Sequence, residues 1–338
     1  MTRVLGILLT LAALPIAVLS LVLILGALAT VAINARVSAA YPPAGPFVAV
    51  TGGRLATIQD GPDDGPPVIL LHGASANASD PMEGIGRRLA AQGFRVIAFD
   101  RPGFGWSDRI DGAAAAAPAV QAGLIAQALA NMGVGPAIVF GHSWAGSLAL
   151  ALAVDHPERV SGLALAAPVA MPMPDRMPDL PWYWRLAVQP PVAWVLSRTV
   201  GPPLAQHFLP EAARRVFTPQ PENRAYPEAA RAQLVLRPGT LLANVQDLLG
   251  LTRALAAQGP RYGGIRVPTL IIAGEADPIV RSEEQAVPLS RTIPGARLVL
   301  LPGIGHMLQY VASERVTEEI VRLSSGSIKA ATAAPAAH

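Results

Sequence analysis

A serine set between two apolar runs, in the hexapeptide GHSWAG at residues 141–146, constrains the fold of this chain more than any other feature. The apolar run 137–140 precedes it and the run 147–153 follows it, an order typical of a strand, a very tight turn and a helix. Such a turn strains the serine backbone, projects its hydroxyl from the end of the sheet and requires small neighbours. Ser143 is therefore a candidate nucleophile. Because the pattern is weak alone and its fifth position is Ala145, this hypothesis depends on the rest of the chain.

Residues 4–33 form a run of thirty residues without a charge. About 20 apolar residues in a helix cross the core of a bilayer, whereas the apolar core of a cleaved signal peptide has about 7 to 15. A buried core helix is not expected, because the run has no polar face. We therefore predict that residues 1–36 form a membrane anchor. An unusually long signal peptide, cleaved at residues 37–39, is the alternative that the sequence leaves open.

The positive charges that set membrane orientation are nearly balanced, because Arg3 and the amino terminus precede the apolar run while Arg36 and Arg54 follow it. We expect a single-pass protein of the bacterial inner-membrane type with an extracytoplasmic catalytic domain, although this charge pattern leaves the orientation open. The chain has no cysteine, so it requires no particular redox compartment.

The charge distribution gives no sign of a nucleic-acid partner. The net charge is only +3, and the arginines are scattered rather than gathered in a basic stripe between aromatic residues. Hydrophobic residues make up 51% of the chain and charged residues 14%, which the N-terminal run largely explains. We expect the membrane as a partner, and no nucleic acid.

Short apolar strands and helices alternate from Val68 onward, after a proline-rich linker and a hairpin that turns at Gly52-Gly53. The strands after the hairpin are expected at residues 68–71, 94–99, 137–140, 160–166, 269–274 and 297–301. Continuous apolar strands separated by helices predict an α/β fold, with a mostly parallel central sheet covered by helices on both faces. The functional loops of such a sheet gather beyond the carboxyl ends of its strands, where Ser143 lies.

The alternation stops between residues 167 and 266, in a proline-rich segment with several tryptophans. We predict that residues 167–266 are an inserted, mainly helical cap and that residues 37–166 and 267–323 form the α/β core. A second independent domain is the alternative for the inserted segment. The Ala/Ser/Pro-rich stretch 324–338 is predicted to be a disordered tail.

A serine hydroxyl needs a base within hydrogen-bond reach, and the base needs an orienting carboxylate. We predict that His306 is the base, because it follows the last expected strand after a glycine-rich loop and can reach back over the sheet. His142 should point away from the neighbouring serine, and His72 should shape the loop after its strand. The other histidines lie at the end of a helix, in the cap and in the tail, at His156, His207 and His338.

The acid is expected in the loop after the penultimate strand, which carries both Glu275 and Asp277. Asp277 lies deeper in this loop and is the predicted partner of His306, with Glu275 as the close rival. Residues 167–170, which follow the strand at 160–166, include no carboxylate, and this removes the other common location.

A developing oxyanion needs two donors, and losing one typically costs about 3 kcal/mol of transition-state stabilisation. We expect these oxyanion-hole donors to be the backbone N–H groups of Trp144 and Ala74, the latter in the loop after His72, with Ser75 as an auxiliary candidate. A capped, aromatic-lined entrance predicts substrate contacts at Ser75, Trp182, Trp184 and Met307.

The chain order Ser143, Asp277, His306 is that of the α/β-hydrolase superfamily, which this sequence resembles from residue 47 to residue 323. The matching segments are residues 70–75, 100–107, 141–146, 274–280 and 303–306. The resemblance implies an α/β-hydrolase fold and a serine hydrolase that works through an acyl-enzyme, without a cofactor or a metal. In relatives the loop at 100–107 is a structural turn near the site, and we assign it no chemistry.

Several activities share this fold, and the residues favour some over others. A serine nucleophile argues against haloalkane dehalogenases and epoxide hydrolases, which resemble this chain but use aspartate at that position. Trp144 is similar to its counterpart in proline iminopeptidases, but the acidic cap residues form no recognisable pattern for binding an amino terminus. Carbon–carbon bond hydrolases often carry tryptophan where this chain has Met307.

A cofactor-free haloperoxidase-like enzyme and a non-catalytic binding module are further alternatives. The binding module is disfavoured because every triad position is filled. We predict a membrane-anchored serine hydrolase that cleaves carboxylic esters of apolar acyl groups.

Overall fold

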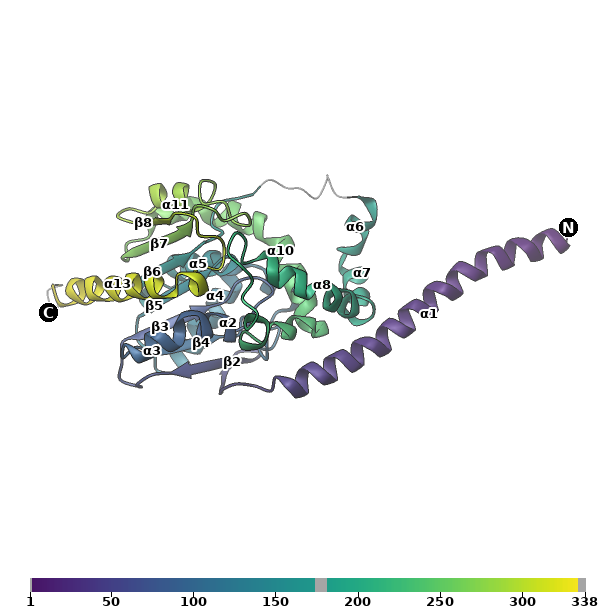
Figure 1. Ribbon diagram of the computed structural model, residues 1–338, viewed down its shortest axis with the longest axis horizontal. Coiled ribbons are helices and arrows are strands. Elements are labelled where there is room, and N and C mark those ends of the chain that lie inside the picture. Colours follow the sequence, from purple (N-terminus) through teal and green to yellow (C-terminus); the bar gives the residue numbers. More distant parts are fainter. Residues whose placement is uncertain (1, 174–180, 334–338) are drawn as a thin grey trace.

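A mixed sheet of eight strands forms the centre of the molecule (Figure 1). The computed structural model describes residues 2–173 and 181–333. Its strands are β1 Phe47–Val50, β2 Gly53–Asp60, β3 Pro67–Leu71, β4 Arg95–Phe99, β5 Ala137–His142, β6 Val160–Ala166, β7 Thr269–Gly274 and β8 Arg297–Leu301. They lie in the order β1-β2-β4-β3-β5-β6-β7-β8, with β1–β2 and β2–β4 antiparallel and every later pair parallel. The predicted α/β fold with its mostly parallel sheet is confirmed.

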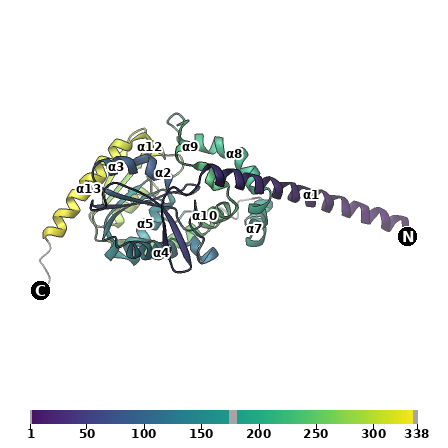
Figure 2. The ribbon, with the colours of Figure 1, turned by 90° about the horizontal axis from the view of Figure 1, so that it is seen from below.

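Helices cover both faces of this sheet (Figure 1 and Figure 2). The α-helices of the described residues are α1 Thr2–Ala40, α2 Ser79–Pro81, α3 Arg87–Ala91, α4 Pro118–Asn131, α5 Trp144–Asp155, α6 Trp182–Ala187, α7 Pro190–Arg198, α8 Gly201–Arg215, α9 Tyr226–Ala229, α10 Pro238–Gln258, α11 Ala286–Thr292, α12 Leu308–Val311 and α13 Ser313–Ala333. On one face α4, α5 and α11 contribute Leu129, Leu148 and Leu289 to one buried cluster. On the other face α3 and α13 contribute Leu89 and Val316 to a second cluster.

Strand β3 shows why its sequence is continuously apolar. Ile69 and Leu71 belong to the cluster on one face, whereas Val68 and Leu70 belong to the cluster on the other. All four side chains are fully buried. Because successive side chains of a strand point to opposite faces, a sheet covered on both sides needs apolar residues at every position.

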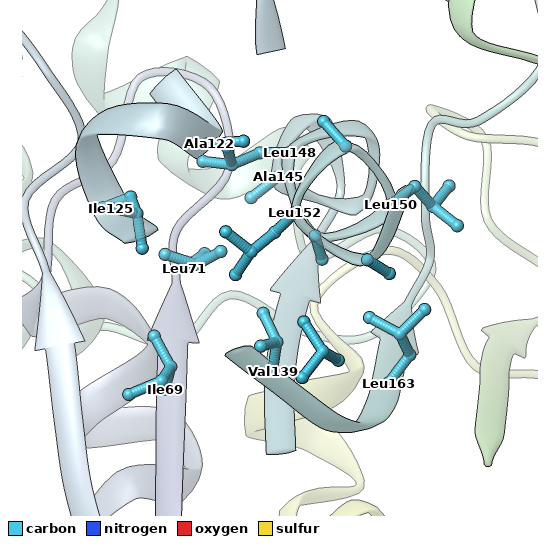
Figure 3. Packing of buried hydrophobic residues seen from close by; sticks show 14 of the residues in the cluster. Ile69, Leu71, Ala122, Ile125, Val139, Ala145, Leu148, Leu150, Leu152 and Leu163 are labelled. Atoms are coloured by element: carbon cyan, nitrogen blue, oxygen red, sulfur yellow. The ribbon is translucent and has the colours of Figure 1, made fainter. Parts of the chain in front are cut away.

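Helix α5 lies against the sheet directly after the serine turn (Figure 3). Ala145, Leu148 and Leu152 pack between α4 and the strands and belong to the same buried cluster as Leu71 and Val139. The helix has no polar face, and its residues from Trp144 to Ala153 are all buried. A helix that is apolar all round is stable only when covered on every side, so α5 fixes the position of the turn before it.

Between the end of β6 and the start of β7, every regular element that the structure describes is helical. Helices α7, α8 and α10 each begin with proline in the first turn, where its missing N–H has no helical partner to lose. Helix α10 joins this segment to the core, because Leu251 and Leu255 belong to the cluster around α5. Residues 174–180 of the expected cap lie outside the described residues.

Helix α1 extends away from the domain along most of its length (Figure 1 and Figure 2). Its part at Ala13–Ala40 is long and apolar enough to cross a membrane, and only 11% of its most apolar window is buried. The helix continues four residues beyond the predicted end of the anchor at residue 36. Its last turns pack on the helical segment, where Ile33, Val37 and Tyr41 share a buried cluster with residues 234–236.

The C-terminal segment continues as a helix where the sequence predicts disorder. Helix α13 runs to Ala333, so the first ten residues of the stretch 324–338 are helical. The hydrophobic positions of α13, such as Val316 and Ile320, lie on one side of the helix against the sheet. Residues 334–338, including His338, lie outside the described residues.

Candidate active site

Ser143 lies in the strained turn that the sequence predicts between strand and helix. Its backbone has φ 54° and ψ −121°, a region that side-chain-bearing residues rarely occupy. A Cβ on Gly141 would lie 2.4 Å from the carbonyl oxygen of Ala145, and one on Gly146 would lie 2.5 Å from the Cβ of Pro168. Both positions therefore require glycine, while the buried Ala145 is accommodated at the fifth position.

Asp277 and His306 form a close pair at the carboxyl ends of β7 and β8. Nδ1 of His306 lies 2.7 Å from Oδ2 of Asp277, and both residues are buried. Oδ1 of Asp277 accepts the backbone N–H groups of Ile279 and Val280 at 2.8 and 3.0 Å. The rival Glu275 is exposed instead. The carboxylate is thus held on both sides, with His306 on one oxygen and backbone donors on the other.

The surroundings of Asp277 favour its charged form. Burial alone would raise the pKa of this carboxyl, but the hydrogen bond and charge of His306 and the two backbone donors outweigh burial and lower the pKa below its ordinary value. An ionised carboxylate at Nδ1 fixes the tautomer of the ring, so that the other nitrogen, Nε2, is free to accept a proton.

A cavity of about 240 Å³ brings the predicted residues together. Ser143, His306, Ala74, Ser75 and Met307 all line it. Within the described chain, no hydrogen bond joins the Ser143 hydroxyl to His306. Catalytic hydrogen bonds in ligand-free enzymes are often long and tighten only when substrate is bound.

The two predicted oxyanion donors are both free to bind an acceptor. The backbone N–H groups of Ala74 and Trp144 have no acceptor in the part of the chain that the structure describes. Trp144 is the first residue of α5, where helical N–H groups have no partner within the helix. The Ala74 loop lies close to the nucleophile, because a Cβ on Gly73 would lie 3.2 Å from the Cβ of Ser143. Free donors beside the nucleophile can stabilise a negatively charged oxygen.

Ser75 is held by a residue that the sequence analysis missed. Asn244 of α10 accepts the backbone N–H of Ser75 at 2.8 Å and donates its amide to the Ser75 hydroxyl at 2.9 Å. These bonds support the left-handed backbone of Ser75, whose φ is 58°. The N–H of Ser75 is therefore engaged with Asn244, whereas that of Ala74, the other candidate in this loop, has no acceptor among the described residues. No local sequence pattern marks Asn244, because its role depends on α10 crossing the loop.

A buried arginine ties the loop, the turn and α10 together. The Arg101 guanidinium lies 4.1 Å from the ring of Phe104 and 4.0 Å from that of Trp144. It donates to the carbonyl oxygens of His72 and Gly73 at 3.0 and 3.3 Å. The loop at 100–107, to which we assigned no chemistry, thus positions the residues on either side of the cavity.

Asp247 of α10 neutralises this arginine. Its Oδ2 lies 2.6 Å from Arg101 and its Oδ1 lies 2.8 Å from Arg109, and the carboxylate is fully buried. Burial lowers the pKa of Arg101 to about 10 against the opposing charge of Asp247, so the arginine remains charged at neutral pH. The backbone oxygen of Asp247 also accepts the indole N–H of Trp144 at 3.1 Å. Neither charge is recognisable in the sequence as half of a buried pair.

His142 contacts the loop of His306 and lines the same cavity as Ser143. Its Nε2 lies 3.1 Å from the backbone oxygen of His306, and its Nδ1 lies 3.4 Å from the amide nitrogen of Gln309. Burial, followed by the charge of His306, lowers the pKa of His142 to about 3, so its ring is neutral. The partners assign the proton to Nε2, which donates to His306 and holds the base loop in place.

The structure does not bring the predicted tryptophans to the cavity. Among the described residues, the cavity wall includes Ser75 and Met307 but neither Trp182 nor Trp184. These rings lie on α6, with 68% and 51% of their surfaces exposed. Helix α6 lies at the outer end of the helical segment, and α8 covers the cavity instead (Figure 1).

Comparisons with known proteins agree with this architecture. A family model described as alpha/beta hydrolase fold matches residues 66–313. Haloalkane dehalogenase 2 of Mycobacterium tuberculosis is 27% identical over 285 residues, which cover 80% of this chain and 91% of that protein. A thermophilic esterase from Thermogutta terrifontis has a similar structure, with a TM-score of 0.62 and 25% identity over 83% of this chain and 98% of that one.

The structure of a membrane phospholipase A, a bacterial virulence factor, shares the fold over a longer span. The likeness has a TM-score of 0.62 at 23% identity and covers 97% of this chain and 99% of that one, so it extends into α1. The family match spans most of the sequence, and the sheet order and the serine turn agree with it. This chain belongs to the α/β-hydrolase fold family.

Proposed function

We propose that this protein is a membrane-anchored serine hydrolase that cleaves carboxylic esters. One observation carries the proposal: Ser143, on a turn with φ 54°, opens onto the same cavity as His306, whose ring is paired with Asp277. A nucleophile, a base and an orienting carboxylate are the parts that acyl transfer from an ester requires.

In the proposed mechanism, the Ser143 hydroxyl attacks the ester carbonyl while Nε2 of His306 takes its proton. Asp277 stabilises the resulting imidazolium, and the N–H groups of Ala74 and Trp144 stabilise the oxyanion. Collapse of this intermediate breaks the bond to the alcohol, which leaves with the proton from His306. A water molecule, activated by the same histidine, then attacks the acyl-enzyme and releases the acid.

The cavity wall favours a small or medium apolar acyl group. Helix α8 contributes Leu209, Ala212 and Ala213, and Val216 follows directly after the helix. Together these residues form an aliphatic part of the cavity wall. A cavity of about 240 Å³ accommodates a short acyl chain. Binding of this chain is favourable because its apolar surface leaves water.

Full-length protein in detergent micelles is expected to release p-nitrophenol from short-chain p-nitrophenyl esters and to be labelled at Ser143 by a fluorophosphonate. Both follow from a serine whose proton His306 can remove. Absorbance assays and peptide mass spectrometry measure the two results. Halide release from 1-chlorobutane without ester hydrolysis, or labelling at another serine, would contradict the proposal.

We also propose that α1 remains attached as the membrane anchor. Cleavage at residues 37–39 would cut through a packed cluster, because Val37 is fully buried and Tyr41 donates to Glu228 at 2.7 Å. The exposed rings of Trp182 and Trp194 lie on neighbouring helices, and such rings favour the membrane interface.

The mature protein is therefore expected to keep its N-terminal residues and to stay in the membrane after alkaline carbonate washing. An N-terminal epitope tag and the intact mass of the purified protein measure the first result, and the washed pellet measures the second. A mature chain that begins within residues 38–41, or full release by carbonate, would exclude the anchor.

A further inference from the structure

Asp80 is a buried acid beside the nucleophile for which the proposed mechanism has no use. It lies in α2, is 1% exposed and lines the same cavity as Ser143 and His306. In the described chain no arginine pairs with it, in contrast to Asp247. A fully buried acid without a cationic partner is unusual, because burial penalises its charged form.

The backbone of Asp80 makes a contact that does not need its carboxyl. Its backbone oxygen accepts the Tyr310 hydroxyl at 2.8 Å, and this contact would survive replacement of the side chain. Its carboxyl oxygen Oδ1 has no hydrogen-bond partner. Burying a carboxyl with an unpaired oxygen costs stability, which suggests that the carboxyl has a use other than stability.

The region around Asp80 has more acceptors than donors. Besides Oδ1 of Asp80, the buried Oε1 of Gln309 also has no partner. The hydroxyls of Tyr226 and Tyr310 and the Gln309 amide lie near enough to stabilise the carboxylate, but burial outweighs them and raises the pKa of Asp80 to about 7. A ligand that fits here must bring a hydrogen-bond donor.

Tyr226 gives this part of the cavity its second polar group. It is half-buried and lines the cavity together with Asp80. Burial, followed by the charge of Asp80, raises the pKa of Tyr226 well above its ordinary value, so its hydroxyl keeps its proton. Aliphatic side chains in α8 and just after it, from Leu209 to Val216, also line the cavity. Besides the triad candidates, the cavity thus combines two polar groups, Asp80 and Tyr226, with aliphatic surface.

We propose that Asp80 and Tyr226 form a subsite that binds a hydroxyl group of the ester substrate. The substrate hydroxyl donates to Oδ1 of Asp80, and its oxygen accepts from the hydroxyl of Tyr226. A neutral hydroxyl can pair with either protonation state of the acid, whereas an ammonium group would have to be desolvated beside an aliphatic wall. The inference rests on the proposed ester hydrolysis at Ser143.

The test compares esters that differ only by a hydroxyl in place of a methyl group. Full-length protein in detergent is assayed with 2-hydroxyethyl and propyl esters of one acid, and with 3-hydroxybutyrate and 3-methylbutyrate esters of one alcohol. At least one hydroxylated ester is expected to exceed its partner in kcat/KM by about fivefold or more, as expected for a buried hydrogen bond. Titration of product release by a pH-stat measures both rates.

Three variants assign this preference to the subsite. Asp80→Leu removes both acceptors and is expected to bring the ratio within each pair to about one or below, whereas Asp80→Asn keeps an acceptor and retains part of it. Tyr226→Phe removes only a hydroxyl and is expected to lower the ratio. The exposed Glu275→Gln serves as a control that leaves the ratio unchanged. The ratio within a pair cancels any general loss of active protein.

The outcomes separate this inference from the function on which it rests. Hydrolysis of simple esters with equal rates within every pair would overturn the subsite alone and would indicate that water fills this end of the cavity. Preference for a 2-aminoethyl ester over the 2-hydroxyethyl ester would overturn the assignment to hydroxyl groups. Failure to hydrolyse any ester would overturn both proposals together.

Discussion

Replacing Ser143 by alanine is expected to lower kcat for p-nitrophenyl esters by on the order of 10⁴-fold to 10⁶-fold. Without the hydroxyl there is no acyl-enzyme, and only the oxyanion donors and the cavity remain to assist attack by water. Stopped assays with full-length protein in detergent measure kcat, and fluorophosphonate labelling should disappear in parallel. His306→Ala is expected to give a loss of similar size, because the two residues act as one unit.

A control separates chemistry from stability. Ser143 has φ 54°, so Ser143→Gly removes the nucleophile and relieves backbone strain, which is worth about 1 kcal/mol or more. This variant should be inactive while its apparent Tm rises. Full ester hydrolysis by Ser143→Ala would show that another group attacks the substrate.

Replacing Asp247 by alanine is expected to cause the largest loss of stability among single substitutions near the site, about 3 to 5 kcal/mol. The carboxylate is fully buried between Arg101 and Arg109, and its removal leaves a charged Arg101 without a partner in a buried position. Activity should fall as well, because Arg101 also holds the carbonyls of His72 and Gly73 beside the oxyanion donors. Thermal unfolding followed by circular dichroism measures the first effect.

An exposed ion pair provides the matched control for Asp247. Glu211 lies 2.7 Å from Arg214, nearly the same distance as in the buried pair, but both side chains are about half exposed. Glu211→Ala is expected to change stability by less than about 1 kcal/mol, because water screens surface pairs. Equal effects of the two substitutions would show that burial of Asp247 does not determine its importance.

The sheet and the order of the site residues could be predicted because their signals are local. Continuous apolar runs separated by helices mark parallel strands buried on both faces, and β3 and β5 appear where these runs lie. The signal of the serine turn is also local, since its glycines are required by close contacts with Ala145 and Pro168. Asp277 and His306 could be selected because the loops after successive strands meet at one edge of the sheet.

The contacts of the helical segment could not be predicted, because they depend on how distant elements cross. Asn244 and Asp247 lie in an ordinary amphipathic helix, and only the path of α10 over the loop brings them to Ser75 and Arg101. The prediction that the tryptophans of α6 line the cavity was wrong for the same reason, since residues of α8 line it instead. No local sequence pattern distinguishes Asp80 from an exposed polar residue of a loop, and only the structure shows that it is buried.

The packing of α1 on the helical segment limits how far the domain can move relative to α1. Six residues separate the end of α1 from β1, and this connection is fastened, because the carbonyl of Tyr41 accepts the Trp106 indole at 2.9 Å and that of Pro42 accepts Arg231 at 2.8 Å. A domain on a loose stalk would sample many heights and tilts above a bilayer. In the membrane-anchored protein that we propose, the domain would instead keep one height and one tilt, so that the mouth of its cavity would meet only molecules that arrive at that level.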